Sequence, residues 1–374
     1  MDKIKKLIFR LLVSIKYYRM QKENKGYIKN YVLQDESCNS DKDFLKINSP
    51  QIWLKCFLEY NKYKPKEVKK MVDHLFGNNV YIVKKSYKQM IPQDEPILIC
   101  NVKNDLERVK MLVNHHKGLG IKYFAFLDNM STDGTYEWLQ SQAFDVFRVE
   151  EQYNSVVRSM WITKIASYYG FDRWFITIDS DELLVYDNFE NQTIQNVILE
   201  LKRKGIERGL GFMIDMYAES SDLKGDISER DIYSTYNLFD SEGYSEVTGI
   251  LGAKIHGGPR ERYFGKAALM TKYPLFYWHN GEINRYHYIF PMKNEKNSKC
   301  YFGLLHYKFI DGDYNKIKKI VEEGNYASGS SLYKTYLHGI NENGKISFYY
   351  NGTRKFEKSS DLLNIKILNS LWKK

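Results

Sequence analysis

Short apolar runs alternate with amphipathic stretches through the middle of the chain. The runs lie at 97–100, 123–127, 145–149 and 174–178. Continuous apolar runs of this length predict buried strands, and apolar positions three and four residues apart predict helices. The helices are expected at 105–119, around Trp138 and at 156–169. This alternation predicts an α/β fold, a Rossmann-like and mostly parallel central sheet flanked by helices.

The ends of the chain do not share this regular alternation. Pro92 and Pro96 mark the first boundary, since proline interrupts regular elements. We expect an N-terminal extension at 1–95, the main α/β domain at 96–310, and a C-terminal helical and β extension at 311–374 packed on it.

A basic amphipathic helix is expected at the N-terminus. Ile and Leu recur at helical spacing between residues 4 and 15, with Lys and Arg around them. The apolar run is shorter than the about 20 residues that span a bilayer. Such a helix lies on a membrane surface or packs on its own protein or a second copy, and the pattern does not decide between these interpretations.

The most informative stretch joins the fourth apolar run to three acids. Trp174 to Ile178 leads directly into Asp179, Asp181 and Glu182. The carboxyl ends of parallel strands are where open α/β sheets bind ligands. Adjacent carboxylates suit a divalent cation with oxygen ligands, Mn²⁺ or Mg²⁺, and the phosphates of a substrate beyond it. The alternative is a helix N-terminus, where acids favour the helix dipole.

Further acidic turns follow the other predicted strands. They contain Asn104 and Asp105, then Asp128 and Asn129, and then Asp133. The ends of parallel strands share one edge of the sheet, so these residues are expected in one nucleotide-binding pocket together with Asp179. No Gly-x-Gly-x-x-Gly follows the first strand and no P-loop occurs, which excludes the usual dinucleotide and ATPase motifs.

Composition narrows the class of partner. Lys and Arg exceed Asp and Glu, and the net charge is +10, which suits an anionic partner such as a nucleotide or a phospholipid surface. The four cysteines are far apart and form no Cys-x-x-Cys pair. This spacing argues against a zinc knuckle and a disulfide scaffold.

The chain resembles family-2-type glycosyltransferases with the GT-A fold. The matching motifs are Asn101 to Asp105, Asp128 to Thr135, and Ile178 to Leu184. Two later stretches, 257–262 and 304–309, look like the bacterial subgroup related to family 92. Asp105 departs from the family pattern, which usually has Glu there.

This resemblance implies a metal-dependent enzyme that transfers a sugar from a nucleotide-sugar donor, UDP-type, to a glycan or lipid-linked acceptor. It implies metal ligands at Asp179, Asp181 and His306. The catalytic base of an inverting reaction is expected at Asp215, with Glu261 as second choice. Arg260, Arg262 and Lys308 are expected on the phosphates or the acceptor, and the alternative for each is a solvated surface charge.

The expected role is bacterial surface-polysaccharide synthesis, of lipopolysaccharide or capsule. The expected location is the cytoplasm, with peripheral contact with the inner membrane if the N-terminal helix lies there. A phosphatase or phosphotransferase is a rival enzyme class, but its Asp-x-Asp-x-Thr turn would follow the first strand, and here Leu183 stands in the Thr position. A non-catalytic nucleic-acid- or membrane-binding protein and an inactive scaffold are the rival classes without activity. The dispersed basic residues argue against nucleic acid as the partner.

Overall fold

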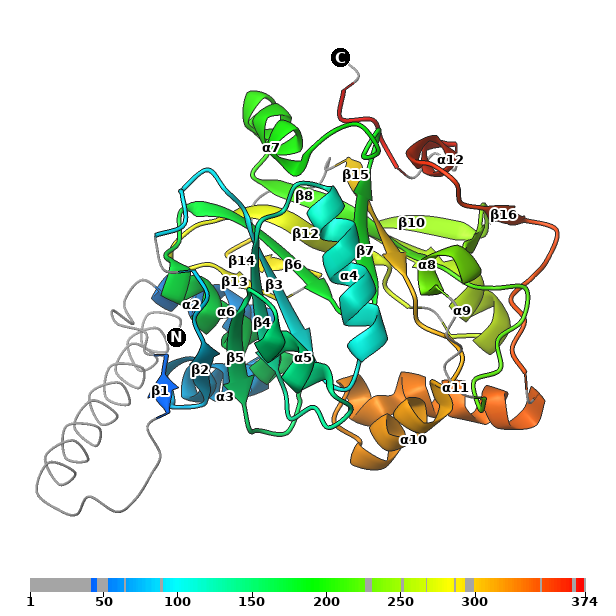
Figure 1. Ribbon diagram of the computed structural model, residues 1–374, viewed down its shortest axis with the longest axis horizontal. Helices are drawn as coiled ribbons and strands as arrows, with labels where there is room; N and C mark the ends of the chain where they lie inside the picture. The colour runs from blue at the N-terminus through cyan, green and yellow to red at the C-terminus, as the bar shows by residue number, and fades with distance from the viewer. Residues whose placement is uncertain are drawn as a thin grey trace, which may run out of the picture.

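A ten-stranded sheet forms the centre of the molecule, with helices packed around it (Figure 1). The computed structural model describes residues 42–372 except 46–52, 64, 88–89, 226–230, 250–251, 267, 286, 293–298, 344 and 365–367. The strand order is β1-β2-β5-β4-β3-β6-β12-β8-β15-β7. The predicted α/β class, with a Rossmann-like parallel core flanked by helices, is confirmed.

The parallel part of the sheet is the part that the apolar runs predict. Its strands are β3 (Ile97–Val102), β4 (Tyr123–Asp128), β5 (Asp145–Val149) and β6 (Arg173–Asp179). The connecting helices are α4 (Leu106–Gly118), α5 (Thr135–Ser141) and α6 (Ser155–Tyr169). These strands are almost wholly buried, which explains their continuous apolar sequences. These four strands lie in the order β5-β4-β3-β6, which places the carboxyl ends of β3 and β6 side by side.

The other part of the sheet departs from the parallel repeat. Its strands are β7 (Glu182–Tyr186), β8 (Arg208–Asp215), β12 (Thr271–Trp278) and β15 (Cys300–His306). β12 runs antiparallel to both β6 and β8, and β7 forms the edge beside β15. Asp179 ends β6 and Glu182 begins β7, so a two-residue turn joins strands that are four places apart in the sheet. The helix-N-terminus alternative for these acids is therefore wrong.

Two glycines in this part of the sheet leave no room for a side chain. A Cβ at Gly209 would lie 2.2 Å from the Phe302 ring, and one at Gly303 would lie 2.8 Å from the Val185 side chain. Such distances are shorter than the contacts that packed atoms make. Glycine at these positions lets β8 and β15 approach their neighbours closely.

The described portion of the N-terminal extension is integral to the fold. β2 (Val80–Lys84) pairs with β5, and β1 (Asp43–Phe44) pairs with β2. Helices α2 (Leu54–Tyr63) and α3 (Pro65–Phe76) belong to a buried cluster that includes Met160 of α6. The predicted amphipathic helix near the N-terminus lies outside the described residues. Within the described ranges, no helix is long and apolar enough to cross a bilayer.

The C-terminal extension builds a separate apolar cluster. Helices α10 (Tyr314–Glu323) and α11 (Ala327–Asn343) lie next to each other at the lower edge of Figure 1. Ile317 and Tyr336 of these helices pack with Phe309, which follows β15. This cluster holds the two helices beside the strand ends that carry the acids.

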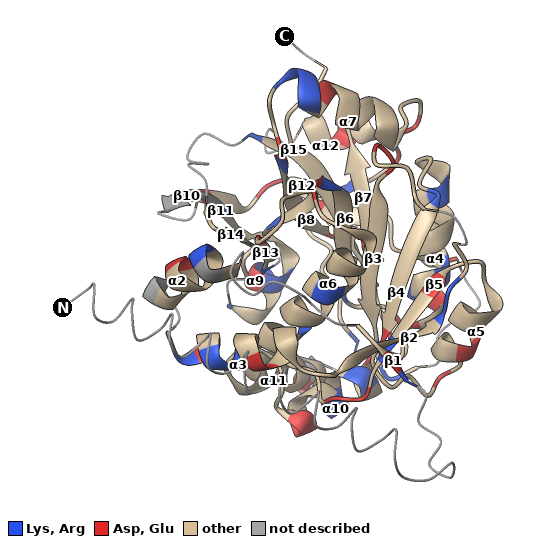
Figure 2. Cartoon of the chain, turned by 90° about the vertical axis from the view of Figure 1, so that its left-hand side faces the viewer, with Lys and Arg blue, Asp and Glu red and all other residues tan. Residues whose placement is uncertain are grey.

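Short elements complete the chain. The helices are α7 (Ile194–Arg203), α8 (Ile232–Thr235), α9 (Gly258–Phe264) and α12 (Ser359–Leu363). The paired strands are β9 (Leu238–Asp240) with β16 (Thr353–Lys355), β10 (Tyr244–Gly249) with β11 (Gly252–Gly257), and β13 (Ile283–Asn284) with β14 (Ile289–Phe290). Figure 2 shows charged residues mainly on helices, loops and strand ends, while the strands of the large sheet are mostly uncharged.

Two adjacent histidines fasten the end of α4 to the sheet. His115 Nε2 lies 2.7 Å from the carbonyl oxygen of Leu184 in β7. The Leu184 amide donates to His116 Nε2 at 3.3 Å, and His116 Nδ1 lies 2.7 Å from the carbonyl oxygen of Leu112 within α4. Burial lowers the pKa of His115 to about 4 and also lowers the pKa of His116, so both rings are neutral at neutral pH.

These neutral histidines predict an acid-sensitive fold. In the unfolded chain a histidine titrates near pH 6.5. Between about pH 6.5 and about pH 4 the unfolded chain binds more protons, so the free energy of unfolding decreases as the pH is lowered. His115→Gln removes one such group and should flatten this dependence by up to about 1.4 kcal/mol per pH unit. Urea denaturation between pH 7.5 and 5 measures it. His338→Gln, at a side chain 71% exposed, is the control that should keep the wild-type slope; the same slope in both variants would contradict the prediction.

Candidate active site

Three carboxylates gather at the turn between β6 and β7. Asp179 ends β6, Asp181 lies in the turn and Glu182 begins β7. All three line a cavity of about 530 Å³. Asp181 and Glu182 are buried, and Asp179 is half-buried. A carboxylate removed from water needs positive partners to stay ionised, so these partners determine what the site can do.

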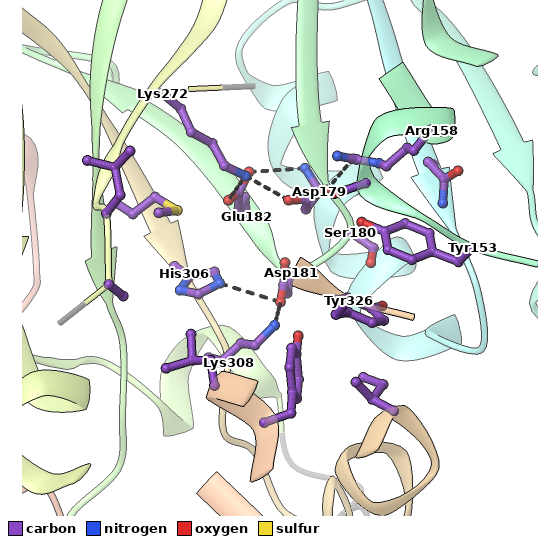
Figure 3. A pocket seen from close by; sticks show the side chains of 18 of the residues that line it. Tyr153, Arg158, Asp179, Ser180, Asp181, Glu182, Lys272, His306, Lys308 and Tyr326 are labelled. Atoms are coloured by element: carbon purple, nitrogen blue, oxygen red, sulfur yellow. Dashed lines mark hydrogen bonds and ion pairs between the residues drawn. The ribbon is translucent and has the colours of Figure 1, made fainter. Parts of the chain in front are cut away.

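Asp179 is held between two cations. The Arg158 guanidinium of α6 donates to Oδ1, and Lys272 Nζ of β12 lies 2.6 Å from Oδ2. Burial alone would raise the pKa of Asp179, but Arg158 and Lys272 lower it to about 2. Figure 3 shows Lys272 reaching both Asp179 and Glu182, and it forms an ion pair with each. Both oxygens of Asp179 are therefore engaged by side chains of the protein.

Asp181 has looser partners. Lys308 Nζ lies 3.3 Å and His306 Nε2 lies 3.5 Å from the same oxygen, Oδ2 (Figure 3). Burial opposes ionisation, but Lys308 and His306 hold the pKa of Asp181 well below its usual range. Asp181 is thus an ionised carboxylate with longer contacts than Asp179 has.

His306 contacts a further carboxylate, Asp215, on the side of the ring away from Asp181. Asp215 Oδ1 lies 2.6 Å from His306 Nδ1, and Asp215 Oδ2 accepts a hydrogen bond of 2.7 Å from Arg260 Nε. Asp215 is 3% exposed and does not line the cavity. Burial opposes its ionisation, while Arg260 and His306 lower its pKa. The structure therefore places the first-choice base behind His306. Glu261, the second choice, is also absent from the cavity lining, and the base assignment stays a prediction.

Basic side chains dominate the cavity wall. Three acids line the cavity, against seven Lys and Arg residues. The basic residues are Lys103, Arg158, Arg260, Lys272, Arg285, Lys308 and Lys316. Each has a carboxylate partner, and the partners of four of them do not line the cavity: Glu323 (Lys103), Asp215 (Arg260), Glu67 (Arg285) and Asp105 (Lys316). The cavity surface is therefore positive, and part of the compensating negative charge lies behind it.

Helix α11 and the segment between α10 and α11 supply most of an aromatic wall. Tyr326, Tyr333 and Tyr336 line the cavity together with Tyr153, which follows β5. The Tyr153 and Tyr326 rings stack with centroids 4.5 Å apart, and Lys308 Nζ lies 5.1 Å from the centre of the Tyr333 ring. This wall adds apolar surface and hydroxyl groups to a cavity that is otherwise strongly charged.

Two ion pairs fasten α10 to the loop after β3. Lys316 Nζ lies 2.8 Å from Asp105 Oδ1, and Lys103 Nζ lies 3.4 Å from Glu323 Oε1. Asp105 also accepts a hydrogen bond from Ser180 in the acidic turn. Asp105 thus joins the turn to α10, although it does not itself line the cavity.

The residues predicted to bind the nucleotide stabilise the loops after β3, β4 and β5, either within one loop or between neighbouring loops. Asn104 Oδ1 accepts from the Thr132 amide at 2.7 Å, and Asp133 Oδ1 accepts from the Thr135 amide at 3.0 Å. Asp128 is fully buried and accepts from the Ser131 amide. The side-chain amide of Asn129 donates from Nδ2 to the backbone carbonyl oxygen of Glu151. Of the predicted nucleotide residues, Asp179 lines the cavity, and Asn104, Asp105, Asp128, Asn129 and Asp133 do not.

The predicted phosphate residues separate into two groups. Arg260 and Lys308 line the cavity. Arg262 does not, because its guanidinium binds Asp240 at 2.9 and 3.1 Å and lies over the Tyr350 ring. Arg262 therefore joins α9 to β9 and the segment before β16.

Sequence reasoning missed most of the cations. Lys272 lies within an apolar strand, Arg158 within a buried helix, and Arg285 just after a two-residue strand. A lone charge within an otherwise apolar element is an available signal, because a buried charge requires a partner. The sequence does not say which partner that is.

The acids and His306 suit a divalent cation. Asp181, Glu182 and His306 each place one ligand atom within 4.8 Å of the others, and all three are buried. Carboxylate and imidazole ligands fit Mn²⁺, and Mg²⁺ prefers the carboxylates. Asp179, predicted as a ligand, is not in this group of three, and both its oxygens bind cationic side chains. The residues present therefore fit a metal centred on Asp181 and His306.

Comparison with known proteins gives only distant similarity. No protein-family model and no curated protein matches the chain. A solved glucosyl-3-phosphoglycerate synthase from Mycobacterium tuberculosis, in complex with Mn²⁺ and UDP, is 12% identical with a TM-score of 0.22. The match covers 32% of this chain and less than half, 43%, of that synthase.

Two further solved structures match over longer stretches. CMP:2-keto-3-deoxy-manno-octonic acid synthetase with CTP is 7% identical, with 68% of this chain and 88% of that chain covered and a TM-score of 0.25. The inositol-1-phosphate CTP transferase from T. maritima is 11% identical, with 74% and 98% covered and a TM-score of 0.24.

The paired charges predict a large effect from removing one cation. Lys272→Met leaves Asp179 and Glu182 without their shared partner, and breaking a buried ion pair costs about 3–5 kcal/mol. The free energy of unfolding from denaturant titration should fall by about this amount. Lys318→Met, in an exposed pair with Glu322, should change it by less than about 0.5 kcal/mol. Equal stabilities of the two variants would show that Lys272 is not essential to the charge balance.

Proposed function

We propose that the protein is a metal-dependent glycosyltransferase that uses a nucleoside-diphosphate sugar, UDP-type, as donor. The acceptor is a glycan or lipid-linked sugar, and the pathway is bacterial surface-polysaccharide synthesis. The proposed stereochemical outcome is inversion, by analogy with the family-2-type glycosyltransferases whose motifs the chain resembles. The observation that carries the proposal is the buried acidic turn facing a cavity whose other charged walls are Lys and Arg.

The charge distribution supports a diphosphate ligand. Lys103, Lys308 and Lys316 line the cavity near the acidic turn or beside the loop after β3. Their ammonium groups can donate to phosphate oxygens, because each has three N–H donors and is not restricted to one partner. The carboxylates of the turn would repel the same phosphates unless a cation lies between them.

The catalytic contribution of each group follows from this arrangement. A divalent cation, when bound, neutralises the diphosphate as it leaves the sugar. Asp181 and His306 would hold the cation, with Glu182 beside them. Arg158 and Lys272 keep Asp179 ionised and in place, and they present further N–H donors at the cavity wall. The tyrosine wall excludes water from one side of the cavity.

The hydrolase alternative has less support. An aspartyl nucleophile needs a free carboxylate oxygen, and both oxygens of Asp179 bind cationic side chains. The motif also follows the fourth strand of the parallel core rather than the first. These two features favour sugar transfer from a bound diphosphate over nucleophilic attack by Asp179.

Metal binding tests this proposal. Mn²⁺ should bind wild type and strengthen UDP binding, as followed by electron paramagnetic resonance and calorimetry. Loss of a residue that supports a metal ligand costs about 10–100-fold in metal affinity. Asp181→Asn removes a proposed ligand itself, so it should weaken Mn²⁺ binding by more than this. Asp179→Asn should weaken it less, because Asp179 binds Arg158 and Lys272.

Asp133→Asn is the matched control, since Asp133 lies outside the cavity lining and accepts from the backbone amides of Thr135 and Leu106. It should keep wild-type affinity for Mn²⁺ and UDP. Absence of Mn²⁺-dependent UDP binding in wild type, or full binding in Asp181→Asn, would refute the proposed metal site. If the metal site is supported, a panel of UDP-sugars can be tested for slow Mn²⁺-dependent release of UDP, and the sugar that is hydrolysed identifies the donor.

A further inference from the structure

We propose that Asp215 is a positioning residue that holds the His306 ring with Nδ1 protonated and Nε2 turned toward Asp181. The inference rests on the proposed function only for the identity of the ion that Nε2 would meet. The orientation of the ring is a property of the metal-free chain and is testable without any metal.

The contact with Asp215 fixes the orientation of the imidazole ring. The Nδ1 to Asp215 Oδ1 distance is 2.6 Å, whereas Nε2 lies 3.5 Å from Asp181 Oδ2. His306 is 5% exposed, so the ring has little freedom to turn. The shorter and more buried contact is the one that sets the orientation, and it directs Nε2 to the cavity side, where His306 and Asp181 lie together (Figure 3).

Arg260 fixes the carboxylate in turn. Its Nε donates to Asp215 Oδ2 at 2.7 Å, and the guanidinium is buried. An arginine side chain only donates hydrogen bonds, so the atom facing it must be an acceptor. An ionised Asp215 satisfies both neighbours, because one oxygen accepts from Arg260 and the other accepts from His306 Nδ1–H.

When the ring carries a single proton, the short contact with Asp215 keeps that proton on Nδ1 and leaves the Nε2 lone pair available. A neutral imidazole carries its proton on one nitrogen only, and the other nitrogen can bind a metal. Metal-binding histidines commonly donate their second N–H to a carboxylate, which fixes the tautomer. Asp215 therefore prepares His306 for a cation, in contrast to the base role, which needs a carboxylate facing the acceptor.

The substitution Asp215→Asn makes a sharp test, because it keeps the shape and changes the hydrogen-bond pattern. The asparagine oxygen must face Arg260, which only donates. Its amide nitrogen then faces His306 Nδ1, which has to accept. The proton moves to Nε2, and the nitrogen turned toward Asp181 loses its free lone pair.

The first measurement uses metal-free protein. Nitrogen-15 correlation spectra of His306 at alkaline pH, where the ring carries one proton, report which nitrogen holds it. Wild type should show the Nδ1–H tautomer, and Asp215→Asn should show Nε2–H. The same tautomer in both proteins would overturn the proposal.

The second measurement is Mn²⁺ affinity by electron paramagnetic resonance. Asp215→Asn should weaken Mn²⁺ binding by about 10–100-fold, while UDP affinity without metal stays at the wild-type value. Asp240→Asn is the matched control: Asp240 is also buried and also binds an arginine, Arg262, but has no contact with His306 among those described. It should keep wild-type Mn²⁺ affinity.

The outcomes separate this inference from the proposed function. Wild-type Mn²⁺ affinity in Asp215→Asn would overturn the positioning role while leaving the metal site intact. Failure of wild type itself to bind Mn²⁺ would refute the proposed metal, and the tautomer measurement would still decide the role of Asp215. Thermal unfolding of each variant identifies any loss of fold.

Discussion

Three carboxylates within four residues, mostly removed from water, impose the strongest constraint on this molecule. Cations from other segments pair with Asp179, Asp181 and Glu182, and a buried carboxylate without such a partner would destabilise the fold. Lys272 provides much of the compensating positive charge, since it pairs with two of the acids. Because it belongs to β12, the same contact holds that strand between the parallel core and the rest of the sheet.

The parallel core was predictable because each of its parts has a local signature. Buried strands such as β3 and β6 read as continuous apolar runs, and the acids of the turn follow one of them directly. The position of β12 was not predictable in the same way. It is inserted beside β6 although it follows almost a hundred residues later, and no local pattern encodes that pairing.

The site was only partly predictable, because a sequence pattern does not show which way a side chain points. Asp179, Asp181, His306, Arg260 and Lys308 do line the cavity. Asp128 and Asp133 do not, because an acid at the end of a strand also accepts hydrogen bonds from the backbone of its own turn. Sequence shows that such an acid is present but not which way it turns. Arg158 and Lys272 were missed because each sits in an element whose apolar neighbours identify it as core.

The two-residue turn between β6 and β7 dictates the curvature of the sheet. Three peptide units reach at most about 11 Å, whereas four strand spacings in a flat sheet amount to about 19 Å. The five strands from β6 to β7 must therefore bend round on themselves, as the strands of a partial barrel do. Their ends consequently surround one point, where Asp179, Lys272, Asp215, His306 and Glu182 meet. Gly209 and Gly303 permit this bend, and larger residues there would open the ring of strand ends and separate the charged groups without replacing any of them.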